Sequence, residues 1–161
     1  MDHAHHVVEQ WQAERPDLDA SPILVIGRIH RLAIALDSEL LKVYAAHGLG
    51  DGDFDVLATL RRSGPPYELT PSELVEQTMV TSGAVSKPLD RLEGAGLVER
   101  RVSHGDRRSR IVGLTRPGRE LIDRAVPAHL ANEARLLAAL SDRERTQLAG
   151  LLGKLAESLG L

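Results

Sequence analysis

The segment SHGDRRSRIVGLT, residues 103–115, brings Arg107, Arg108 and Arg110 close to a single carboxylate, Asp106. A guanidinium is always charged and weakly hydrated, which suits a position against phosphates or inside a narrow minor groove, where negative potential is concentrated. Asp106 would then orient one of the guanidinium groups. A solvated, charged hairpin tip is the alternative interpretation, so the surrounding elements must decide between the two.

Positive charge is concentrated in one quarter of the chain. Residues 81–119 contain nine Lys and Arg residues against four Asp and Glu, a local net charge of +5. The whole chain of 161 residues has a formal net charge of −3, so the remainder carries −8. This distribution is typical of a phosphate-facing surface on an otherwise acidic protein.

The composition excludes several other kinds of site. The chain has no Cys, which rules out disulfides, Cys-zinc sites and thiol nucleophiles. Aromatic residues make up 2% of the chain, too few for a stacking platform that binds single strands. No nucleophile elbow, phosphate-cradling Gly loop, pair of acids or metal-ligand spacing indicates an enzyme. We therefore expect no catalytic residue, metal or cofactor.

The chain also lacks the sequence features of a membrane protein. No run of about 18 apolar residues is present, and the N-terminal MDHAHHVVEQW does not resemble a signal peptide. We expect a cytoplasmic location and no membrane partner.

Apolar spacing, caps and breakers predict a mainly α-helical chain with a small β-hairpin. The N-terminal part is expected to contain a helix at 3–13, a linker at 14–22 and a long helix from Pro22, with Ser21 as its N-cap, that stops at 47–50. The middle part is expected to contain a helix at 51–64, a helix after the capping box of Thr70 and Glu73, a helix capped by Thr81, and strands at 97–103 and 109–115. The C-terminal part is expected to contain a helix from about 119 that is interrupted or bent at Pro127, and a last helix capped by Ser141 and Glu144.

A helix-turn-helix followed directly by a hairpin is a winged helix-turn-helix. Its second helix would enter the major groove, while the arginine-bearing hairpin would lie along the backbone. This context favours DNA binding over a merely solvated hairpin tip.

Residues 21–160 resemble the MarR family of transcriptional regulators in GDFDVLATL, LTPSELVEQTMVTSGAVSKPLDRLEGAGLVER and DRRSRIVGLTRPG. The resemblance implies a homodimer that binds a pseudo-palindromic operator in double-stranded DNA. It also implies an extra helix and linker at 1–20, a helical dimerisation lobe at 21–49 and 115–161, and a winged helix-turn-helix DNA-binding lobe at 50–114.

The same resemblance assigns roles to single residues. Arg108 would be the minor-groove arginine, oriented by Asp106 and supported by Arg107 and Arg110. The residues implied to contact the major groove and phosphates are Thr81, Ser82, Ser86, Lys87 and Arg91.

The N-terminal WQAERPDLDASPILVIGRI is similar to the urate-responsive, PecS-like branch of this family. That similarity implies a pocket for an anionic, aromatic-like effector, with Trp11, Asp55 and Arg100 at three of its positions. The branch has an arginine at the fourth position, where this chain has Pro88. The missing cation predicts weak binding of urate, or a preference for a less anionic aromatic such as a phenolic acid. Pro88 is also expected to bend its helix.

Each of these three residues has a simpler interpretation. Trp11 would only pack the extra helix, Asp55 would only favour the start of its helix through the dipole, and Arg100 would be a phosphate contact or a strand-face charge. His3, His5 and His6 suggest a metal site, but so close to a chain end a disordered segment is the favoured interpretation.

The leading function is therefore a ligand-responsive, dimeric, DNA-binding transcriptional regulator, and more specifically a repressor. A winged-helix module used only for protein contacts is the second candidate, and an enzyme the third.

Overall fold

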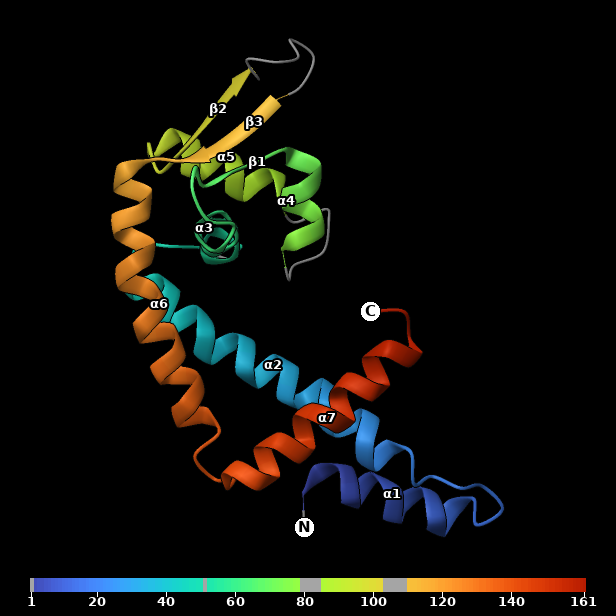
Figure 1. The fold of residues 1–161 in the computed structure, drawn as a ribbon. Helices are drawn as coiled ribbons and strands as arrows, with labels where there is room; N and C mark the ends of the chain where they lie inside the picture. Colours follow the sequence, from blue (N-terminus) through green and yellow to red (C-terminus); the bar gives the residue numbers. More distant parts are fainter. Residues whose placement is uncertain (1, 51, 79–84, 103–109) are drawn as a thin grey trace. The chain divides into compact units, whose positions relative to one another are not determined.

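The computed structural model describes residues 2–50, 52–78, 85–102 and 110–161. They form two compact units, Met1–Leu40 and Leu41–Leu161, with one helix running through the boundary. The elements are α1 (His3–Glu14), α2 (Ile23–Ala46), α3 (Asp53–Arg62), β1 (Glu68–Leu69), α4 (Pro71–Gln77), α5 (Ser86–Gly94), β2 (Val98–Val102), β3 (Arg110–Leu114), α6 (Arg116–Leu136) and α7 (Asp142–Ser158) (Figure 1). The mainly helical fold with a small sheet confirms the expected fold class.

In the N-terminal unit, α1 is attached to the first part of α2. Asp2 caps α1 by accepting a hydrogen bond from the backbone N–H of His5 at 3.0 Å. The same carboxylate forms an ion pair with Arg28 of α2 at 2.7 Å. Ala4 is buried, and a Cβ built on Gly27 of α2 would lie 3.8 Å from the Ala4 Cβ. The helix expected at 3–13 is thus confirmed.

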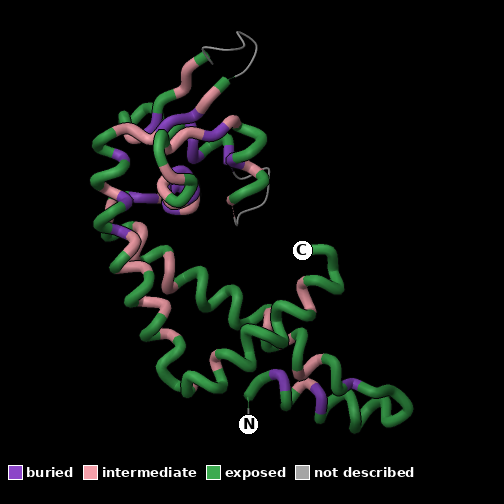
Figure 2. The backbone as a smooth tube through the Cα atoms, in the orientation of Figure 1, coloured by how far each residue is buried: buried purple, intermediate pink, exposed green. Residues whose placement is uncertain are grey.

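The hydrophobic core of the second unit lies between α3, α4, α5, the sheet and the first turns of α6 (Figure 2). Leu57, Leu60, Leu74, Val112 and Ile122 are completely buried there. By contrast, α7 has no buried residue. Its amphipathic sequence therefore leaves an apolar face uncovered within this chain.

Local sequence signals determine where several helices begin. Thr70 and Glu73 form the expected capping box of α4, and Ser141 and Glu144 form that of α7. In both boxes the side-chain oxygen accepts from the third N–H of the helix, and the glutamate accepts from the cap residue. Thr81, the expected cap of the next helix, lies outside the described residues.

Two helix starts differ from the expectation. α2 begins at Ile23, so Pro22 precedes the helix instead of opening it. α6 begins at Arg116, earlier than expected, because Thr115 caps it by accepting from the backbone N–H of Gly118 at 3.1 Å. A Thr-x-x-Gly sequence is a weak cap signal, since it lacks the glutamate of a capping box.

Pro127 and Pro88 both lie within helices. α6 continues through Pro127 as one helix, so of the interruption or bend expected there, the interruption does not occur. Pro88 is the third residue of α5 as described. The carbonyl that a helical N–H at position 88 would meet belongs to residue 84, which lies outside the described residues, so the expected bend at Pro88 stays a prediction.

The sheet has the strand order β1-β3-β2, with both pairs antiparallel. Val98 lies opposite Leu114 and Val102 opposite Arg110, which confirms the expected hairpin strands. β1 was not expected, because two residues show no alternation. No described helix is long and apolar enough to cross a membrane.

Candidate nucleic-acid interface

Helices α4 and α5 are followed by the antiparallel strands β2 and β3, and the hairpin projects away from the helices (Figure 1). α5 presents two kinds of surface. Its apolar side chains Leu89 and Leu92 are buried, whereas Ser86 and Lys87 in its first turn are exposed. A fixed inner face and an accessible, hydroxyl- and amine-bearing first turn are what a helix needs to enter a major groove.

Of the nine residues expected to contact DNA, the structure describes four, and all four are exposed: Ser86, Lys87, Arg91 and Arg110. The other five lie outside the described residues: Thr81, Ser82, Asp106, Arg107 and Arg108. The minor-groove role of Arg108 and its orientation by Asp106 therefore stay predictions.

Arg91 is held by another residue of the protein. Its Nη2 donates to Oδ1 of Asp53 at 2.9 Å, and the Asp53 side chain is only 7% exposed. Local sequence patterns did not indicate this pair, because the two residues are 38 positions apart. Arg91 therefore connects α5 to the start of α3.

Arg100, expected to bind an effector anion, connects β2 to α5. Its Nη2 donates to Oδ1 of Asp90 at 2.6 Å, and its Nη1 lies 3.5 Å from a carboxylate oxygen of Glu93. Arg101, the next residue, points to the other face of the strand and pairs with Glu68 of β1. Part of the positive charge of residues 81–119 is thus neutralised within the fold.

Asp55, the second expected effector residue, lies on α3 with a side chain 17% exposed. A carboxylate oxygen of Asp55 lies 3.9 Å from Nη1 of Arg62, and Arg62 also donates to the backbone carbonyl of Gln77. Gln77 is the last residue of α4. Asp55 is therefore linked through Arg62 to the end of the first helix of the helix-turn-helix.

Trp11, the third expected effector residue, lies on α1 in the other unit, with about half of its surface exposed. The two units are described separately, so the convergence of Trp11 with Asp55 and Arg100 stays a prediction. Among the described residues, no group of three or more His, Asp or Glu side chains is arranged to hold a metal ion.

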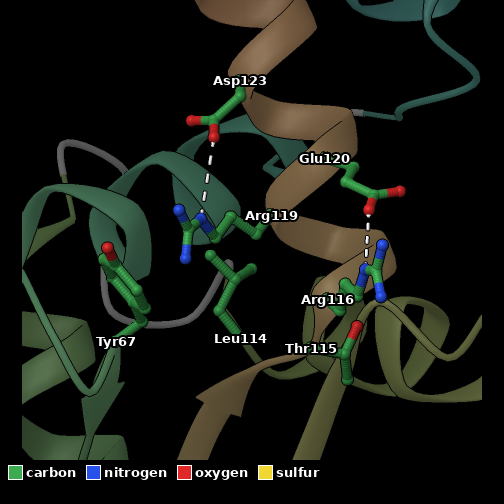
Figure 3. Close-up of a pocket in the computed structure, with 7 residues that line it drawn as sticks. All are labelled: Tyr67, Leu114, Thr115, Arg116, Arg119, Glu120 and Asp123. Carbon is green, nitrogen blue, oxygen red and sulfur yellow. Dashed lines mark hydrogen bonds and ion pairs between the residues drawn. The ribbon is translucent and has the colours of Figure 1, made fainter.

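The sequence did not indicate a hollow of about 520 Å³ between Tyr67 and the start of α6 (Figure 3). The guanidinium groups of Arg61 and Arg119 each lie 5.1 Å from the centre of the Tyr67 ring. Asp123 pairs with both arginines, at 2.7 and 3.8 Å, and its hydrogen bond raises the pKa of Arg61. These interactions hold α3, the segment before β1 and α6 together.

A second cluster joins the last part of α2 to α3 and α6. The rings of Tyr44 and Phe54 are stacked with their centres 4.6 Å apart, and the His129 ring lies 4.5 Å from Phe54. Nε2 of His129 lies 3.2 Å from a carboxylate oxygen of Glu133. The cluster fixes α3 to the last part of α2 and to α6.

Comparison with known proteins agrees with this arrangement. Residues 47–109 match the sequence pattern of the MarR family. Over 153 residues the chain is 44% identical to the HTH-type transcriptional regulator PecS of Dickeya dadantii, which covers 95% of this chain and 92% of that protein.

Two solved structures are similar in fold. The DNA complex of Sco3205, a MarR family regulator from Streptomyces coelicolor, has a TM-score of 0.78 and 25% identity, with coverage of 88% of this chain and 89% of that one. BpsR of Bordetella bronchiseptica, whose DNA binding is regulated by 6-hydroxynicotinic acid, has a TM-score of 0.71 and 25% identity, with coverage of 81% and 92%.

Proposed function

The chain belongs to the MarR family of helix-turn-helix transcriptional regulators, and we propose that it is a homodimeric repressor that a small planar effector releases from DNA. The observation that carries the proposal is the exposed first turn of α5 beside the β2–β3 hairpin, within a segment of net charge +5. α5 is then the recognition helix. The Sco3205 complex supports this, because that relative binds DNA with the same fold. Because the proposed target is genomic DNA, the protein would act in the cytoplasm.

A second copy of the chain is the proposed partner of the helices outside the winged domain. α7 has no buried residue, and Leu148, Leu151 and Leu152 on it are all at least 41% exposed. A monomer rarely leaves such contiguous apolar surface in water. Closed two-fold symmetry would present two recognition helices to two half-sites about one turn of DNA apart. We therefore expect a pseudo-palindromic operator.

The proposed effector is a planar anion or aromatic acid, such as urate or a phenolic acid, held by Trp11, Asp55 and Arg100. The regulation of BpsR by 6-hydroxynicotinic acid supports this chemical class. In this chain Arg100 is already engaged by Asp90 and Glu93 of α5. An anionic effector would compete with these two carboxylates, so α5 would lose a connection to β2 when the effector binds.

Such competition gives the effector different affinities for the two states of the protein, which a ligand needs in order to shift an equilibrium. Pro88 has no charge, so position 88 offers the effector no cation. The coupling would therefore run through Arg100 and through Asp55, whose partner Arg62 holds the end of α4.

The proposal is tested in two steps. Selection from random double-stranded DNA should enrich an inverted repeat, and sedimentation should show a dimer at micromolar concentration. Enrichment of no sequence, or a monomer, would contradict the proposal and favour the protein-interaction module. With the selected DNA in hand, urate and phenolic acids are titrated while Trp11 fluorescence is recorded, since Trp11 is the only tryptophan.

A planar anion should quench Trp11 and release the DNA, and Arg100→Ala should abolish both effects. Arg101→Ala is the matched control, because Arg101 is the neighbouring arginine but pairs with Glu68 on the other face of the strand. If no planar anion alters the Trp11 fluorescence at millimolar concentration, the result would contradict the proposed effector pocket and leave Trp11 only the role of packing α1.

A further inference from the structure

The side chain of Asp53 is buried at the start of α3, with 7% of its surface exposed. Among the described residues, Asp53 is the only buried Asp or Glu. Burial of a charged group is costly unless the group is paired and hydrogen-bonded. Asp53 therefore needs partners, and the fold supplies them from two other segments.

Both oxygens of the carboxylate are used. Oδ1 accepts from Nη2 of Arg91 in the last turn of α5, at 2.9 Å. Oδ2 accepts from the backbone N–H of Gly50 at 2.6 Å. One side chain thus joins three elements: the connection that follows α2, the first turn of α3, and α5.

The packing around this carboxylate leaves little room at position 50. A Cβ built on Gly50 would lie 3.0 Å from Oδ2 of Asp53 and 3.5 Å from Nη2 of Arg91. The first distance is to the carboxylate of the ion pair and the second is to its guanidinium. The backbone can approach the pair this closely because residue 50 has no side chain.

We infer that Asp53 is a positioning residue for the recognition helix, and that Arg91 supports operator binding through Asp53 instead of through a phosphate. This inference rests on the proposed binding of DNA through α5. Arg91 lies in the last turn of α5, whereas Ser86 and Lys87 lie in its first turn. A helix of this length spans about 13 Å, so a small rotation at the Arg91 end displaces the DNA-facing end. Without Asp53, that end of α5 loses its attachment to α3.

The two roles of Arg91 make different predictions for salt dependence. Loss of a phosphate contact lowers affinity and reduces the slope of log K against log salt by about 1. Loss of a positioning pair lowers affinity but leaves the slope unchanged, because the number of phosphates neutralised is the same. The variants are Asp53→Asn, Arg91→Ala and the double variant, with Lys87→Ala as the phosphate-contact control and Arg116→Ala as the control outside the interface.

We expect Asp53→Asn and Arg91→Ala each to weaken operator binding by about tenfold at an unchanged slope. The double variant should bind the operator no more weakly than the weaker-binding of the two single variants, because the effects of substituting residues that act as one unit do not add. Lys87→Ala removes one phosphate contact from each subunit of the dimer and should reduce the slope by about 2, since each contact contributes about 1. Wild-type affinity in Asp53→Asn, or a slope reduced by about 2 in Arg91→Ala, would overturn the inference.

A measurement without DNA separates this inference from the proposed function. Amide hydrogen exchange of residues 86–94 should be faster in folded Asp53→Asn than in the wild type, because α5 has lost an attachment. Asn is close in size to Asp and removes the buried charge, so this variant should remain folded, as circular dichroism would verify. Unchanged exchange overturns the inference, whereas failure of the wild type to select any DNA overturns only the proposed function.

Discussion

Arg100 and Asp90 are joined across the boundary between β2 and α5, with Nη2 and Oδ1 2.6 Å apart. The Arg100 side chain is 29% exposed, and Asp90 is largely in solvent. This pair therefore connects α5 to β2 at a position where a solute can still reach the guanidinium. Under the proposed function, Arg100 would pair either with α5 or with an anionic effector.

If the effector competes with the carboxylates of α5, removing one of them should favour the effector. We expect Asp90→Asn to bind a planar anion several-fold more tightly than the wild type, as Trp11 quenching would show, and to leave the operator at a lower effector concentration. Exposed ion pairs are worth only about 0.2–1 kcal/mol, which limits the gain to a few-fold. Unchanged or weaker effector binding in Asp90→Asn would argue against competition.

The arginine-bearing hairpin gives a prediction that the sequence alone supports. Arg108→Ala should weaken operator binding about tenfold or more, because a good specific contact is worth about 1–3 kcal/mol. Arg116→Ala should have little effect, since Arg116 lies on α6 with its side chain 90% exposed and pairs with Glu120. Gel-shift titrations compare the two variants; equally small losses would remove Arg108 from the interface.

Gly118 gives a prediction about stability. A Cβ at this position would lie 2.0 Å from the backbone oxygen of Leu97, which cannot move aside as a flexible side chain can. We expect Gly118→Ala to lower the free energy of unfolding by about 1–3 kcal/mol or more, measured by urea unfolding. Gly94→Ala is the control, because nothing lies within 4 Å of its added Cβ. Similar unfolding curves for the two variants would show that α6 does not start against Leu97.

Asp2 makes the attachment of α1 dependent on pH. Hydrogen bonds from Arg28 and from the backbone of His5 lower the pKa of Asp2 from 3.8 to about 2. Because the folded pKa is below the unfolded one, the ionised carboxylate stabilises the fold above about pH 4, and this contribution is lost as the pH falls toward 2. The Asp2→Asn variant lacks this stabilising contribution at every pH. The difference in urea midpoint between wild type and Asp2→Asn should therefore shrink from pH 5 to pH 2, and a constant difference would contradict this role.

The sequence predicted the features that depend on neighbouring residues. The capping boxes of α4 and α7 and the strands of the hairpin follow from signals a few positions long, and the structure confirms them. Thr115 was missed as the cap of α6 because its sequence lacks the usual glutamate.

The long-range pairs could not be predicted in this way. Asp53 and Arg91 are 38 positions apart, and Arg61 and Asp123 are 62 apart. Nothing in the local pattern of either residue names its partner. The family resemblance implied a DNA contact for Arg91, and the structure adds its pairing with the buried carboxylate of Asp53. The contact of Arg91 with DNA stays a prediction.

The central claim, that this chain binds double-stranded DNA through α5 and the hairpin, is tested most directly by the salt dependence of operator affinity. The dissociation constant of the wild-type protein for its selected operator is measured over a series of salt concentrations. Each phosphate neutralised contributes about −0.9 to the slope of log K against log salt. For a dimer with several basic contacts per subunit, we predict a slope of about −5 or steeper. A slope near zero, or equal affinity for DNA of any sequence, would contradict the account.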